Sequence, residues 1–215
     1  MQQIFDESFI LKLSKRQTNF ELFNHVKNTL FSNLQDAKFF YNINPKNIFI
    51  LNLDNFNELK DSDAVIAPMF FHKKNNIDNA LKNIQSKLSE RGILLGNIFG
   101  SFNLQILGSL LAGHDIKHFG KPLLRMLPAI NIKTIGQLLQ KHGFSKIVVS
   151  SEFVDFDFSN LKEALKFLQK SGETNCLVAR DKTLLSGNVL KKYIENYQNP
   201  VRLSFEVCFF SCLNC

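Results

Sequence analysis

The sequence lacks a long hydrophobic run. Its longest apolar stretches, such as Val65–Phe71 and Ile93–Leu95, fall far short of the roughly 20 residues that a helix needs to cross a bilayer. The first residues also lack a basic segment followed by an apolar one, so a secretory signal is not expected. These absences predict a chain with no membrane span and a cytoplasmic location.

Cysteine is scarce as well, and the four cysteines are Cys176, Cys208, Cys212 and Cys215. They do not have the paired CxxC spacing of a zinc site, so no metal is expected. On a strand, Cys208 and Cys212 would share one face and Cys215 would lie on the other, because side chains alternate. We expect small buried apolar side chains followed by a frayed tail.

The net charge of +7 comes from 26 basic and 19 acidic residues. Lysine supplies most of the basic residues, and the lysines are dispersed from Lys12 to Lys192. Nucleic-acid surfaces usually concentrate Lys and Arg on one stripe. We therefore do not expect a nucleic acid partner, and a basic RNA-binding module is kept only as a third alternative.

The 215 residues, 45% of them apolar and 21% charged, are typical of one globular domain. We expect a single domain over 1–215, with N-terminal helices in 1–43 and an α/β core in 44–215. In the first part, apolar residues recur at the three- and four-residue spacing of a helix face. Asn44-Pro45 ends this pattern, because a residue before proline disfavours the helical conformation.

After Ser62, apolar runs alternate with helical segments, which predicts βαβ units and a mainly parallel sheet. The expected strands are Lys46–Leu53, Ala64–Met69, Ile93–Phe99, Lys146–Ser151 and Val201–Cys212. The expected helices are Asn76–Ser89, Ser101–Ala112, Ile132–His142, Leu161–Ser171 and Lys182–Asn196. Gly92, Gly143 and Gly172 are expected to end helices, and Gly113–Pro122 to form a long loop.

Three segments, Leu88–Gly100, Ile135–Phe144 and Gly172–Arg180, read LSERGILLGNIFG, IGQLLQKHGF and GETNCLVAR. They resemble segments of the class I S-adenosylmethionine-dependent methyltransferases of the complex I assembly factor 5 and BioC group. Ile4-Phe5-Asp6, followed by Arg16, resembles the opening of these proteins. The resemblance implies a Rossmann-like sheet, mainly parallel with an antiparallel C-terminal strand and with helices on both faces.

The sequence departs from this family in its first third, where no glycine occurs before Gly92. The family holds S-adenosylmethionine at a glycine-rich turn after its first strand, because residues without Cβ let the backbone approach the ligand. The stretch from Gln35 to Asp63 has room for one strand where the family has three. We interpret Asn47–Leu53 as the third, which predicts a truncated sheet. The alternative is the first strand with a degenerate turn, which would give Asp54 a ribose-binding role.

Candidate site residues follow from the resemblance. Asp54 and Glu58 are candidate cofactor-binding residues, since the family has acids after this strand. His72 takes the position of a family histidine and could act as a base at neutral pH, but it has no identified carboxylate partner, so no catalytic residue is assigned. Lys73 replaces a family tryptophan, which weakens an enzymatic interpretation.

The remaining candidates are residues for a substrate or partner. His114 and Asp115 would lie in the loop that corresponds to the family's lid, and Glu173, Thr174 and Asn175 in a segment that borders its substrate cleft. We expect these five to form one exposed surface. Phe70-Phe71 and Phe209-Phe210 place one ring of each pair on each sheet face, and one of those faces is a candidate partner surface.

These observations favour a degenerate methyltransferase-like protein, a pseudoenzyme without an S-adenosylmethionine cofactor, that acts by binding a protein partner. The alternative is an active S-adenosylmethionine-dependent enzyme that methylates or otherwise modifies a protein side chain or a small molecule. The missing glycine turn distinguishes the two.

Overall fold

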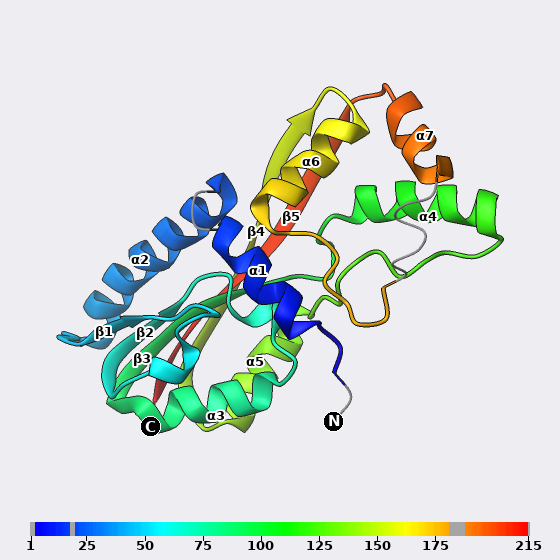
Figure 1. Ribbon diagram of the computed structural model, residues 1–215. Coiled ribbons are helices and arrows are strands. Elements are labelled where there is room, and N and C mark those ends of the chain that lie inside the picture. Colours follow the sequence, from blue (N-terminus) through cyan, green and yellow to red (C-terminus); the bar gives the residue numbers. More distant parts are fainter. Residues whose placement is uncertain (1–2, 18–19, 181–187, 215) are drawn as a thin grey trace.

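The computed structural model describes residues 3–17, 20–180 and 188–214. Within them, five strands form one sheet of order β1-β2-β3-β5-β4, with helices on both faces (Figure 1). The strands are β1 (Ile48–Ile50), β2 (Ser62–Ala67), β3 (Leu88–Phe99), β4 (Phe144–Phe158) and β5 (Val201–Asn214). The helices are α1 (Glu7–Gln17), α2 (Glu21–Tyr41), α3 (Ile77–Lys87), α4 (Gln105–Phe119), α5 (Ile132–Lys141), α6 (Leu161–Ser171) and α7 (Asn188–Asn196), with short 3₁₀ helices η1 (Phe56–Glu58) and η2 (Phe71–Lys73).

The strand directions confirm the predicted fold class. β1, β2 and β3 are parallel, and β5 is antiparallel to both of its neighbours, β3 and β4. β1 lies at the edge of the sheet, with β2 as its neighbour. The edge position does not identify which strand of the family β1 corresponds to, so the deletion interpretation stays a prediction.

Two apolar cores lie on opposite faces of the sheet. On β2, Ala64 and Ile66 belong to one core, and Val65 and Ala67 to the other, as alternation along a strand requires. Helices α2, α4, α6 and α7 cover the first face, and α3 and α5 the second. α2 buries a leucine or valine at nearly every fourth position, which is the spacing of a single helix face.

Asparagine and glycine set most helix ends. The side chains of Asn76, Asn131 and Asn160 accept a backbone N–H in the first turns of α3, α5 and α6, as N-cap residues do. Gly143 and Gly172 have φ of +75° after α5 and α6. Both predicted glycine stops are thus confirmed.

Two predictions were wrong, the helix end at Gly92 and the loop at Gly113–Pro122. α3 ends at Lys87 and β3 begins at once, so Gly92 lies in a strand, and Arg91 has the positive φ, +60°. α4 continues to Phe119, so most of the expected Gly113–Pro122 loop is helix. A glycine inside a helix costs only about 1 kcal/mol, and residues beyond Gly113 continue the buried face of α4.

Strand β4 is longer than the predicted Lys146–Ser151, because Val154, Phe156 and Phe158 alternate with polar residues and pack on the first core. The helix predicted over Lys182–Asn196 begins, within the described residues, at Asn188. Its first part, 182–187, lies outside the described residues, as does Cys215.

The predicted burial of cysteines is confirmed for Cys176, Cys208 and Cys212, and burial raises the pKa of Cys176 and Cys208 to about 11. The two phenylalanine pairs are also buried. Phe209 and Phe210 lie in opposite cores as predicted, but Phe70 and Phe71 both lie in the second core, so the predicted alternation was wrong for that pair, which follows the end of β2. The pairs fill the cores, so the candidate partner surface at these rings was wrong. No helix in the described ranges is long and apolar enough to span a bilayer.

A pair of glycine variants tests this packing. Gly96→Ala is expected to destabilise the protein by about 1–3 kcal/mol, because the new Cβ would lie 2.5 Å from Cζ of Phe210. Gly113→Ala, on the open side of α4, meets no atom within 4 Å and is expected to stabilise by about 0.5–1 kcal/mol. Denaturant unfolding measures both free energies. Equal unfolding free energies for the two variants would contradict the packing around Gly96.

Candidate functional site at the carboxyl ends of strands β2 and β3

Ligands of open α/β sheets bind beyond the carboxyl ends of the strands, and here β2 ends in a tight turn. Met69 has φ of +53°, and its N–H donates to Oδ1 of Asn97 on β3 (2.7 Å). Asn97 is fully buried. The side chain of Asn97 thus fixes the turn, and η2 follows with His72 and Lys73 facing inward.

A buried ion pair lies at this end of the sheet. Lys73 Nζ donates to Glu173 Oε1 (2.8 Å) and to the Gly172 carbonyl oxygen (2.9 Å). The side chains of Lys73 and Glu173 are 0% and 3% exposed. Glu173 directly follows the left-handed Gly172 that ends α6, so the pair joins η2 to the end of α6.

His72 lies beside the pair. Its Nε2 is 3.3 Å from Glu173 Oε2, and its ring packs on Phe99 with centroids 4.8 Å apart. Neither ring nitrogen makes a hydrogen bond within the described residues. The carboxylate partner that the sequence did not identify is therefore Glu173, as a close neighbour without hydrogen-bond geometry.

Burial and charge act in opposite directions on these groups. Burial raises the pKa of Glu173, but Lys73 and, to a smaller extent, His72 together outweigh it and hold the pKa of Glu173 well below its ordinary value. Burial lowers the pKa of His72 below 6.5 because desolvation disfavours the imidazolium. At neutral pH Glu173 is therefore a carboxylate and His72 a neutral imidazole.

The N-terminal motif joins the same region. Phe5 pairs with Leu177 in an antiparallel bridge, and the Asp6 carboxylate accepts a hydrogen bond from Arg180 (2.9 Å). That bond lowers the pKa of Asp6 to about 2. The Asn75 side chain bonds the backbone N–H and carbonyl of Phe5. Two segments that carry the family resemblance, the opening one and Gly172–Arg180, are thus held together by direct contacts.

The candidate cofactor residues lie elsewhere. Asp54, after β1, is exposed and accepts a hydrogen bond from Ser14 of α1 (3.2 Å). Glu58 is an exposed residue of η1. The structure does not bring either acid into the hydrogen bonds or ion pairs of the Lys73–Glu173 cluster.

His114 and Asp115 are buried on α4, so their predicted place in an exposed loop was wrong. Arg125 binds Asp115 with two nitrogens at 2.6 and 2.7 Å. Burial alone would raise the pKa of Asp115, but Arg125 outweighs it and the net pKa is lowered. The His114 ring packs on Tyr193 of α7 with centroids 4.2 Å apart. Both residues thus hold α4 to its neighbours.

The expected common surface forms only in part. Asn175 Nδ2 donates to the Leu124 carbonyl oxygen (2.7 Å), which joins the segment of Thr174 and Asn175, both half-buried, to the chain after α4. Glu173 is instead turned inward to Lys73, because a carboxylate beside a buried ammonium is stabilised by it. The prediction that Glu173 is exposed was wrong.

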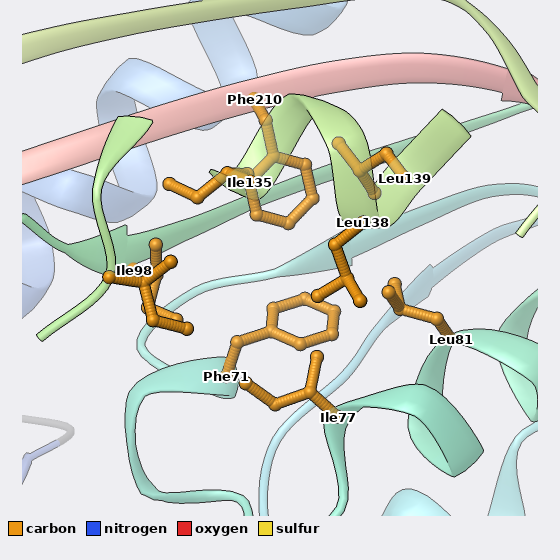
Figure 2. Close-up of a pocket in the computed structure, with 9 residues that line it drawn as sticks. Phe71, Ile77, Leu81, Ile98, Ile135, Leu138, Leu139 and Phe210 are labelled. Atoms are coloured by element: carbon orange, nitrogen blue, oxygen red, sulfur yellow. The ribbon is translucent and has the colours of Figure 1, made fainter. Parts of the chain in front are cut away.

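An apolar pocket lies between α3, α5 and the sheet (Figure 2). Its walls include Phe71, Ile77, Leu81, Ile135 and Phe210, and the cavity volume is about 20 Å³. Such a volume holds little more than one water-sized molecule. The described residues that line it are all apolar, so the pocket has no side-chain polar group that could orient a ligand.

Sequence reasoning missed Lys73 as the partner of Glu173, and it missed Asn75 and the Asp6–Arg180 pair. One signal for the first was present. A lysine in the place of a family tryptophan within a strongly apolar stretch requires a carboxylate partner once it is buried. Nothing local in the sequence identifies which acid supplies it.

Comparisons with known proteins find several curated relatives of the chain. It is 29% identical to "Putative methyltransferase RP459" of Rickettsia prowazekii over 154 residues, 70% of this chain and 68% of that one. It is 25% identical to the mitochondrial arginine-hydroxylase NDUFAF5 of Danio rerio (68% of this chain, 48% of that protein) and 24% to that of Homo sapiens (68% and 44%). The chain is a homologue of these proteins. It spans less than half the length of both hydroxylases. No family model matches it.

Solved structures give weaker likenesses. The chain is similar to YcgJ of Bacillus subtilis with a TM-score of 0.41 and 8% identity, over 72% of this chain and 64% of that one. It is similar to an S-adenosylmethionine-dependent methyltransferase of Archaeoglobus fulgidus with a TM-score of 0.34 and 16% identity, over 74% and 63%.

The fit to S-adenosylmethionine can be tested on the turn after β1, Asn52–Asn55. This turn has no glycine, and its N–H groups at Asn52, Asp54 and Asn55 donate to asparagine side chains within the turn at 2.8–3.0 Å. Beyond β1 the described residues supply no further strand to form a crevice. The residues described at this end do not fit the cofactor.

Removal of the carboxylate is a first test of the cluster. Glu173→Gln is expected to cost about 3–5 kcal/mol of unfolding free energy, because it leaves a buried ammonium without its counter-charge. The double variant Lys73→Met with Glu173→Met removes both charges and is expected to recover most of that loss. Chemical denaturation compares the two, with the exposed Glu163→Gln as control. A single variant as stable as the control would show that the pair is not buried in solution.

The second test is pH. Because the folded pKa of His72 lies below 6.5, the unfolded chain binds more protons as the pH falls through that value, and stability is lost. We expect the unfolding free energy to fall between about pH 7 and pH 5, by at most about 1.4 kcal/mol per pH unit for each such histidine. His114, whose pKa burial also lowers, adds in the same direction. His72→Phe should flatten the profile, and an unchanged slope would contradict the assignment.

Proposed function

We propose that this protein is a pseudoenzyme: a methyltransferase-like protein that does not bind S-adenosylmethionine and acts by binding a protein partner. The observation that supports this proposal is the Lys73–Glu173 ion pair. It fills the end of the sheet where ligands of this fold class lie with the chain's own charged groups.

The position of the pair strengthens the proposal. Glu173 belongs to the segment Gly172–Arg180 that carries the family resemblance, and the opening segment with Asp6 packs against it. The groups of this region are therefore used to hold the scaffold together. A folded scaffold that lacks the glycine turn can still bind another protein. The resemblance to an assembly factor group also favours protein binding.

The alternative is an active S-adenosylmethionine-dependent enzyme that modifies a protein side chain or a small molecule. The relatives named arginine hydroxylase favour arginine as the residue it would act on. This alternative requires that the cofactor bind without a glycine turn.

Calorimetry separates the two. We expect no heat of binding when the purified protein is titrated with S-adenosylmethionine or S-adenosylhomocysteine at micromolar concentration. A methyltransferase known to bind both ligands, titrated from the same stocks, is the control. Saturable binding would overturn the proposal, and loss of that binding in Asp54→Ala would favour the alternative with a ribose contact.

A further inference from the structure

Two histidines occupy neighbouring turns of α4. His114 and His118 are four residues apart in the helix, which places them on the same side of it. Their ring centroids are 4.5 Å apart, and the ring planes are inclined at 39° to each other. His114 is buried and His118 is exposed. The pair thus reaches from the interior of the protein to its surface.

The hydrogen bond of His114 determines which ring nitrogen carries the proton. Nδ1 of His114 is 3.5 Å from Oδ1 of Asp115. Asp115 is paired with Arg125 through two nitrogens, so it is a carboxylate, and a carboxylate can only accept. Nδ1 therefore carries the hydrogen, and Nε2 of the neutral ring has the lone pair.

That lone pair has no donor. Nε2 of His114 is buried and makes no hydrogen bond within the part of the chain that the structure describes. Tyr193 of α7 stacks on the ring, with centroids 4.2 Å apart, and supplies no hydrogen bond to it. A buried polar atom without a partner in the chain is one of the places where an ion binds. Histidines that bind metals are also typically held, as His114 is, by a carboxylate at the other ring nitrogen.

We propose that His114 and His118 bind a divalent transition metal of the zinc, nickel and copper group. Imidazole nitrogen is a preferred ligand of these metals. Two imidazoles that bind one zinc ion at about 2.0–2.1 Å have ring centroids roughly 5 Å apart, which is close to the observed 4.5 Å. The exposed His118 reaches that separation by a small rotation of its side chain.

The proposed site has two protein ligands and is open to solvent. In the described ranges no group of three or more His, Cys, Asp or Glu side chains could hold a metal, so water completes the coordination. The expectation of no metal was based on cysteine spacing and does not bear on a pair of histidines. Mg²⁺ prefers oxygen ligands, and the site therefore discriminates against it.

Calorimetry with metal chlorides tests the proposal. The protein carries no histidine tag, is freed of metal with EDTA, and is dialysed before titration with Zn²⁺ and, separately, with Mg²⁺. We expect saturable binding of one equivalent of Zn²⁺ per chain and no heat of binding with Mg²⁺. In nuclear magnetic resonance spectra, Zn²⁺ should shift the ring signals of His114 and His118 and leave those of His25 in place.

Variants assign the binding to the pair. His118→Ala removes the exposed ligand and is expected to weaken Zn²⁺ binding at least about tenfold. His114→Phe keeps an aromatic ring against Tyr193 and is expected to abolish saturable binding. The matched control is His25→Ala on α2, because His25 is also exposed but lies beside Glu152 and not beside a second histidine. This control should bind Zn²⁺ like the parent protein.

Circular dichroism of each variant verifies that it is folded. Absence of saturable Zn²⁺ binding by the parent protein would overturn the proposal. So would unchanged binding in the His118 variant, which would place the metal elsewhere in the chain, or an equal loss in the His25 variant. None of these outcomes depends on the calorimetry with S-adenosylmethionine.

Discussion

The ligand end of the sheet depends on one buried ion pair, that of Lys73 and Glu173. Burial of either charge alone is costly, so each residue requires the other in place. Through them the turn after β2, the left-handed Gly172 and the end of α6 take up one arrangement. The N-terminal bridge at Phe5 and the Asp6–Arg180 pair are built on the segment that this arrangement positions.

This arrangement changes how the family resemblance is interpreted. A shared motif can persist because it touches a ligand or because it holds the fold. Glu173 and Asp6 have internal partners that account for their residue types. Thr174 and Asn175 are more accessible, and Asn175 bonds the chain after α4. Only these two of the expected surface residues remain available to a partner.

The local features could be predicted from sequence and the long-range ones could not. The spacing of apolar residues predicted α2, and the helix stops at Gly143 and Gly172 were predicted because glycine tolerates positive φ. The prediction of a loop at Gly113 was wrong, because glycine also occurs inside helices. Whether a helix continues past a glycine depends on how the following residues pack. The partner of Lys73 is 100 residues away, a distance at which no periodicity carries information.

The edge strand β1 has a consequence for how the molecule behaves in concentrated solution. A strand whose outer side is unpaired is a template on which another chain can add, which is one origin of aggregation. Here the strand is only three residues long, and Asn55 Nδ2 already donates to the carbonyl oxygen of Ile50 (2.9 Å). The asparagine turn thus occupies one acceptor of the β1 edge, which disfavours edge-to-edge association.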